Sequence, residues 1–227
     1  MPGKLFHPST LDTQGQSWFL MIHADGKFMA NLNFLIKPQD TAVIVHDMQN
    51  GFWKSPHADP RKAEPIIPPI QRFLKVARQL KIPVIYTLVV YGPQRLEVSL
   101  RRKLSGMHGV ERCEDGTWGT EVIDELRPEP GEIVVKKIRY SGFYETGLER
   151  RLRGLGVQNL LITGGSSNWG VEALARDAEY RDFVPIVLSD CTVGTSPELH
   201  AATLENIQLF IGFVMTSEEA IRLLTGS

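Results

Sequence analysis

The chain contains Asn159-Leu-Leu-Ile-Thr163, followed at once by Gly164-Gly-Ser-Ser-Asn-Trp-Gly170 and by a helical stretch that reaches Tyr180. The first segment is short and continuously apolar, which is typical of a strand buried on both faces. Two glycines and small polar residues behind it permit a sharp turn into the helix. This strand, turn and helix unit predicts an α/β protein built on a parallel sheet.

The same alternation recurs along the chain. Strands are predicted at 42–45, 83–90, 132–135, 184–188 and 213–215, and helices at 70–80, 145–155, 170–180, 197–210 and after the capping box that begins at Thr216. Ser196 and Pro197 are typical of a helix start. The predicted fold class is a three-layer α/β/α sandwich with a mostly parallel, six-stranded sheet.

The rest of the chain fits a single domain over residues 1–227. Residues 1–38 are read as an N-terminal extension, with a hairpin over 17–35 around the turn Asp25-Gly26, and residues 39–227 as the core. A long polar connection over 91–118 follows the second core strand, and long connections often carry function.

Composition excludes several classes of protein. The 25 Lys and Arg nearly balance the 26 Asp and Glu, so no basic surface supports nucleic-acid binding. The longest nearly apolar run, 82–91, is too short to span a membrane, and the first residues lack a secretory signal, so a cytoplasmic location is expected. The chain has two cysteines, Cys113 and Cys191, far apart in the sequence. So few thiols are typical of a reducing compartment, and their spacing does not match a zinc-binding motif.

Three candidate groups lie where parallel strands end, which is the edge at which such sheets bind ligands. Asp47 follows the first core strand, one of Lys136 and Lys137 points inward after the third, and residues 164–170 form an elbow whose amides can hold an anion. Each group also has a structural interpretation, as a turn-forming Asp, a surface lysine and a tight turn with a helix cap. No phosphate-binding glycine motif is present.

No metal or other cofactor is predicted. The histidines His46, His57, His108 and His200 have no partner at ligand spacing. Aromatic residues near the predicted site are explained equally well as core residues or as walls of a small-molecule pocket; these are Trp53, Trp118, Tyr140, Phe143 and Trp169.

Three segments, in this order, resemble the isochorismatase-like superfamily, also called the cysteine hydrolases. They are Ala42-Val-Ile-Val-His-Asp-Met-Gln-Asn-Gly-Phe52, Gly131-Glu-Ile-Val-Val-Lys-Lys-Ile-Arg-Tyr-Ser-Gly-Phe143 and Gly164-Gly-Ser-Ser-Asn-Trp-Gly-Val-Glu-Ala-Leu-Ala-Arg-Asp-Ala178. The resemblance runs from about Thr41 to the C-terminus and is closest in style to N-carbamoylsarcosine and ureidoacrylate amidohydrolases.

The resemblance implies roles for particular residues. The family's catalytic Asp falls on Asp47 and its Lys on Lys137, whereas its nucleophilic Cys falls on Gly170. The amides of Trp169 and Gly170 would form the oxyanion hole, and the bond between Gly165 and Ser166 matches a cis peptide of the family. The nucleophile is therefore the one missing part.

Three explanations for Gly170 stay open. The chain can be a variant of a cysteine enzyme, a natural member that needs no cysteine and hydrolyses a vinyl ether with Asp47 as acid, or a binding protein that kept the pocket. Cys191 follows the fifth strand and is a structural thiol rather than a replacement nucleophile.

The favoured function is hydrolysis of a C–N bond in a small amide, carbamoyl or ureido compound. Asp47 is the predicted general base and acid, Lys137 its electrostatic partner, and Gly165, Ser166 and Trp169 belong to the oxyanion elbow. The resemblance also implies a homo-oligomer, a dimer or a tetramer. The residues expected to line the substrate pocket are Gln49, Phe52, Trp53, Tyr140 and Phe143.

Overall fold

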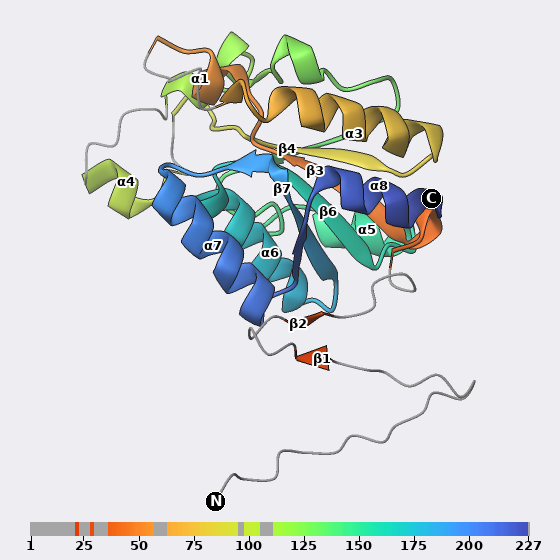
Figure 1. Ribbon diagram of the computed structural model, residues 1–227. Coiled ribbons are helices and arrows are strands. Elements are labelled where there is room, and N and C mark those ends of the chain that lie inside the picture. The colour runs from red at the N-terminus through yellow and green to blue at the C-terminus, as the bar shows by residue number, and fades with distance from the viewer. Residues whose placement is uncertain are drawn as a thin grey trace, which may run out of the picture.

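The computed structural model describes residues 21–22, 28–29, 36–56, 63–94, 98–104 and 111–226. Its centre is a six-stranded sheet in the order β5-β4-β3-β6-β7-β8 (Figure 1). Every pairing within this sheet is parallel, so the predicted fold class is confirmed. The strands are β3 (Thr41–His46), β4 (Val84–Val89), β5 (Ile133–Lys137), β6 (Asn159–Gly165), β7 (Val184–Val193) and β8 (Phe213–Met215).

The strand order reverses between β3 and β6. From β3 the chain moves outward through β4 to β5, and it then returns to β6 on the other side of β3. Loops that leave two neighbouring strands in opposite directions open a crevice at their carboxyl ends, where ligands bind in this class of fold. Asp47 and the elbow after β6 both lie at this crevice, because His46 is paired with Gly164.

Helices cover both faces of the sheet (Figure 1). On one face, α3 (Ile67–Gln79) and α8 (Ser217–Thr225) pack over a core that includes Phe73 and Leu224. On the other, α5 (Leu148–Gly154), α6 (Glu172–Glu179) and α7 (Pro197–Phe210) bury a second core. Two short helices, α1 (Asn50–Trp53) and α4 (Leu100–Leu104), lie in connections.

The helix starts follow the local sequence. The Ser196 hydroxyl accepts a bond from the amide of Leu199, and Pro197 opens α7. Thr216 and Glu219 form the expected capping box at α8. The prediction for β7 was too short, because the polar Ser189 and Asp190 suggested a strand end, whereas Asp190 instead accepts bonds from the amide and hydroxyl of Ser217.

Other boundaries also differ from the sequence prediction. The helix expected from Gly170 begins with a π-helical turn, Ser167–Val171, and only then continues as α6. Of the predicted hairpin, β1 (Met21–Ile22) and β2 (Phe28–Met29) pair antiparallel, and the remainder of 17–35 lies outside the described residues. Within the described part, no helix has the length and apolar character needed to cross a bilayer.

Candidate active site

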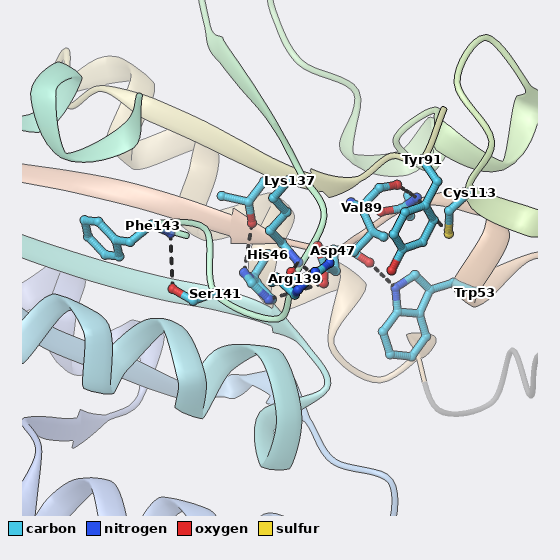
Figure 2. Close-up of polar contacts among 12 residues, drawn as sticks. His46, Asp47, Trp53, Val89, Tyr91, Cys113, Lys137, Arg139, Ser141 and Phe143 are labelled. Carbon is cyan, nitrogen blue, oxygen red and sulfur yellow. Dashed lines mark hydrogen bonds and ion pairs between the residues drawn. The ribbon is translucent and has the colours of Figure 1, made fainter. Parts of the chain in front are cut away.

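Asp47 is held at the mouth of the crevice by backbone and side-chain contacts. It follows β3 with a φ of 53°, a left-handed conformation that Asp adopts more readily than most residues. Its amide donates to the carbonyl of Thr87 over 2.9 Å. Its Oδ2 accepts from the ammonium Nζ of Lys137 over 2.8 Å (Figure 2). The side chain is only 9% exposed, so this is a buried ion pair.

The two lysines at the end of β5, Lys136 and Lys137, point in opposite directions. Lys137 is fully buried and also donates to the carbonyl of Arg139 over 3.0 Å. Lys136 points outward and pairs on the surface with Asp115. Alternation along a strand sends neighbouring side chains to opposite faces, so only one amine reaches Asp47. The structure therefore brings together the two charged residues that the sequence selected.

The electrostatics of the pair favour an ionised carboxylate. Burial alone would raise the pKa of Asp47, but the charge and hydrogen bond of the Lys137 ammonium act against burial, and the pKa lies below its ordinary value of 3.8. Burial lowers the pKa of Lys137, against the opposing effect of Asp47. Asp47 is therefore ionised near neutral pH.

The elbow after β6 packs tightly against β3. Gly164 has a φ of 100°, and a Cβ there would lie 2.1 Å from the carbonyl oxygen of His46. The peptide bond between Gly165 and Ser166 is cis, as the resemblance implied. The amides of Trp169 and Gly170 donate to the carbonyl of Ser166, which they share with the amide of Val171. Their role as an oxyanion hole stays a prediction.

Gly170 faces the imidazole of His46. A Cβ at position 170 would lie 2.2 Å from His46 Nε2, closer than any real contact, and 2.9 Å from Cδ2. The imidazole is fully buried, its Nδ1 lies 2.8 Å from the hydroxyl of Thr87, and its Nε2 lies 3.3 Å from Asp47 Oδ2. The histidine ring thus fills the space in which a side chain at position 170 would begin.

Sequence reasoning missed His46 as a site residue. It was considered only as a metal ligand without a partner, although a histidine at the end of an apolar strand and directly before Asp47 was a visible signal. Burial lowers the pKa of this imidazole below its ordinary 6.5, while Asp47 acts in the opposite direction. The ring is therefore neutral near pH 7.

A family model places these residues in a known context. The model described as "Isochorismatase domain" matches residues 41–219, which is most of the chain. The chain belongs to the isochorismatase family. The match begins at Thr41, where the sequence resemblance also begins, and it includes Asp47, Lys137 and the elbow.

Curated members of the isochorismatase family resemble this chain over most of both lengths. The ureidoacrylate amidohydrolase RutB of Pseudomonas syringae pv. syringae is 33% identical over 205 residues, which cover 81% of this chain and 83% of that protein. The ureidoacrylate amidohydrolase RutB of Methylobacterium radiotolerans is 35% identical over 201 residues, covering 79% of this chain and 77% of that protein. These relatives are named as amidohydrolases, so the predicted enzyme class is confirmed.

Solved structures of the isochorismatase family share the fold. A cysteine hydrolase from Pseudomonas syringae pv. phaseolicola superposes with a TM-score of 0.77 at 28% identity, covering 84% of this chain and 95% of that one. N-carbamoylsarcosine amidase from Thermoplasma acidophilum has a TM-score of 0.67 at 29% identity, covering 79% of this chain and 97% of that one.

The five predicted pocket residues occupy different surroundings. Gln49 is fully buried. Its side-chain nitrogen donates to the carbonyls of Val89 and Gly119, and its side-chain oxygen accepts from the amide of Val89. Phe52 is half-buried against the core. The ring of Phe143 packs on Phe183 and points away from Asp47 (Figure 2), so it is part of the core. The side chains of Gln49 and Phe143 therefore have structural explanations.

The aromatic residues nearer the crevice are better placed for substrate contact. Trp53 is buried, its indole nitrogen donates to the carbonyl of Asp47 over 2.7 Å, and its ring lies against Gly165. Tyr140 and Trp169 are half-exposed and lie with ring centroids 6.2 Å apart. The guanidinium of Arg102 lies 5.1 Å from the Tyr140 ring centroid. Trp118, also noted in the sequence, is 54% exposed on its short turn, and its contact with a substrate stays a prediction.

Neither cysteine has the properties of an activated nucleophile. Both are free thiols and fully buried. Burial raises the pKa of Cys113 to about 12, and it raises the pKa of Cys191 as well. Within the residues described, no cluster of His, Cys, Asp and Glu is arranged to hold a metal ion, and His57 and His108 lie outside them.

The contact between His46 and Gly170 predicts coupled effects on stability. Gly170→Ala should lower the free energy of unfolding by about 1–3 kcal/mol, because the new methyl group collides with the imidazole. In a His46→Val background the same change should cost at least about 1 kcal/mol less. Urea unfolding of the four proteins in this cycle measures the coupling.

Gly154→Ala provides the matched control. Gly154 ends α5, and a Cβ there meets nothing within 4 Å, so the substitution should be neutral or slightly stabilising. Additive effects of Gly170→Ala and His46→Val, within about 0.5 kcal/mol, would contradict the close contact.

Proposed function

We propose that this chain hydrolyses a C–N bond of a small amide, carbamoyl or ureido compound at the crevice between β3 and β6. The observation that carries the proposal is the buried pair of Asp47 and Lys137, joined over 2.8 Å beside the elbow. A paired carboxylate and ammonium in a low-dielectric site can move a proton and stabilise developing charge. The family membership and the named activities of the amidohydrolase relatives support this class of substrate.

The proposed reaction is direct hydrolysis by water. Gly170 offers no nucleophile, and the thiols of Cys113 and Cys191 are held protonated by burial. A water oxygen bonds to the carbonyl carbon, and the tetrahedral intermediate then breaks its C–N bond. The proton removed from water passes through a basic group of the site to the leaving nitrogen, so no covalent enzyme intermediate forms.

The charge state of Asp47 favours this reaction over vinyl-ether hydrolysis. Protonation of a vinyl ether by Asp47 requires a carboxylic acid, whereas its neighbours hold the pKa of Asp47 below 3.8. An ionised carboxylate suits a reaction in which water must be deprotonated. Tyr140 and Trp169, half-exposed at the crevice, are proposed as the apolar walls against which a small substrate lies. The expected homo-oligomer and cytoplasmic location stay predictions.

A substrate panel tests the proposal directly. Purified protein is incubated with amide, carbamoyl and ureido compounds, and ammonia release is measured together with keto-acid release from a vinyl ether. Ammonia release is expected from at least one ureido or carbamoyl compound. Keto acid without ammonia would overturn the proposal in favour of the vinyl-ether reaction, and tight binding without turnover would favour a binding protein.

Substitutions at the ion pair should abolish that activity. Asp47→Asn and Lys137→Met are each expected to lower kcat/KM by about 10²-fold or more. Lys136→Met is the matched control, because its ammonium sits one residue away on the outer face, and it should retain activity. The double variant Asp47→Asn/Lys137→Met removes both charges together and separates lost chemistry from the instability of one unpaired buried charge.

Direct attack by water predicts insensitivity to thiol reagents. Iodoacetamide should leave the activity of the native chain unchanged, since both described thiols are buried and protonated. The double variant His46→Val/Gly170→Cys opens space for a thiol at position 170 and serves as the sensitive comparison, whereas Gly170→Cys alone meets the imidazole. Loss of native activity after alkylation would show that a thiol takes part.

A further inference from the structure

We propose that His46 is the general base of this site, with its Nε2 standing where the side chain of a nucleophile at position 170 would lie. This inference rests on the proposed function and names the group that takes the proton of water. Nε2 is the ring atom nearest to the position of a Cβ at residue 170, at 2.2 Å. The imidazole of His46 therefore occupies the space in which a side chain at position 170 would begin.

Two polar atoms at this point have no hydrogen-bond partner among the residues that the structure describes. They are His46 Nε2 and Asp47 Oδ1, and both are buried. Buried polar atoms are nearly always paired, and exceptions concentrate at sites that bind ligands or water during function. The two side chains are in contact, since His46 Nε2 lies 3.3 Å from the other carboxylate oxygen, Asp47 Oδ2. A water molecule bound between them would meet two acceptors.

The second ring nitrogen is positioned by β4. Thr87 is paired with His46 across the sheet, and its hydroxyl lies 2.8 Å from Nδ1. When Nδ1 carries the proton of the neutral ring, it donates to this hydroxyl and leaves the lone pair of Nε2 free. The strand pairing thus fixes the direction of the ring, and the hydroxyl can pair with either tautomer. A base needs the tautomer that has its proton on Nδ1.

The charged groups around the ring favour its use as a base. Asp47, which directly follows β3, and Lys137 on β5 are the charged neighbours. β4 contributes the neutral Thr87, and the elbow contributes Gly170. The backbone of Tyr140 also contacts the ring. Asp47 is ionised and held by Lys137, which makes it a weak base, whereas the ordinary pKa of an imidazole, 6.5, is closer to neutral pH, although burial lowers the pKa of His46. After the ring takes a proton, the Asp47 carboxylate stabilises the imidazolium.

The proton transfers balance without another reactant. Nε2 accepts a proton from water while the water oxygen bonds to the carbonyl carbon. The imidazolium then returns this proton to the leaving nitrogen as the C–N bond breaks, so the ring ends neutral. Asp47 is 9% exposed and the imidazole fully buried, so a substrate meets the pair from the Asp47 side.

The pH profile of kcat/KM distinguishes the two possible bases. A base works only when unprotonated, so activity falls as the pH drops through its pKa. With His46 as the base, the fall in activity on the acid side (the acid limb) lies below pH 6.5, and its midpoint moves or disappears when His46 is replaced. With Asp47 as the base, activity persists until the pH falls below 3.8.

The decisive variant is His46→Gln, compared with the native chain on the substrate found in the panel. The expected result is a loss in kcat of about 10²-fold or more with KM nearly unchanged, together with loss of the acid limb. Thr87→Val should weaken activity and shift that limb, whereas Thr87→Ser, which keeps the hydroxyl, should restore both. Full kcat and an unchanged limb in His46→Gln would overturn the inference and leave the proposed function standing.

A measurement without substrate tests the same inference. Nitrogen-15 NMR of histidine-labelled protein, assigned with His46→Gln, reports which ring nitrogen carries the proton at pH 7. The expected result is a protonated Nδ1 and a bare Nε2. A protonated Nε2 would overturn the role of base even in an active enzyme. Failure of the native chain to hydrolyse any compound of the panel would overturn both the proposed function and this inference.

Discussion

The buried ion pair of Lys137 and Asp47 is the constraint to which the rest of the site is fitted. Removing two charges from water is costly, and their attraction offsets this cost only when the geometry is good and their other polar atoms are bonded. Here the two atoms are 2.8 Å apart, and Lys137 has a second acceptor in the carbonyl of Arg139. Losing one partner would leave the other charge buried alone, at a cost of about 3–5 kcal/mol.

The sheet topology explains how these charges meet. Lys137 ends β5 and Asp47 follows β3, with β4 between them, so the pair spans the carboxyl end of β4. Short apolar strands and the rule that parallel sheets bind ligands at a reversal of strand order were enough to predict this arrangement. Alternation along β5 was enough to require that one lysine point inward. The family resemblance selected Lys137, and the folded sheet brings the ammonium of Lys137 to Asp47.

Other features depended on contacts that no local pattern encodes. Gln49 looked like a pocket residue, yet its amide is bonded to the backbone of β4, a partner that folding alone supplies. Phe143 follows β5 near the predicted site, but its ring turns into the core against Phe183. His46 and Gly170 each carried a weak signal, as a lone histidine and a missing cysteine. Their meaning appears only when β3 and the elbow lie side by side.

The resemblance implies a nucleophilic thiol at position 170, and an imidazole in that place gives the site a different charge balance. A thiolate beside Asp47 would place two anions near the single ammonium of Lys137, so a shared proton would be needed. A neutral imidazole leaves the ion pair balanced before reaction. Once the ring takes a proton from water, the site gains one positive charge at the moment when the carbonyl oxygen becomes negative. In a buried site this positive charge stabilises the tetrahedral intermediate. A chain with Gly170 can therefore stabilise the intermediate electrostatically without forming a covalent bond to the substrate.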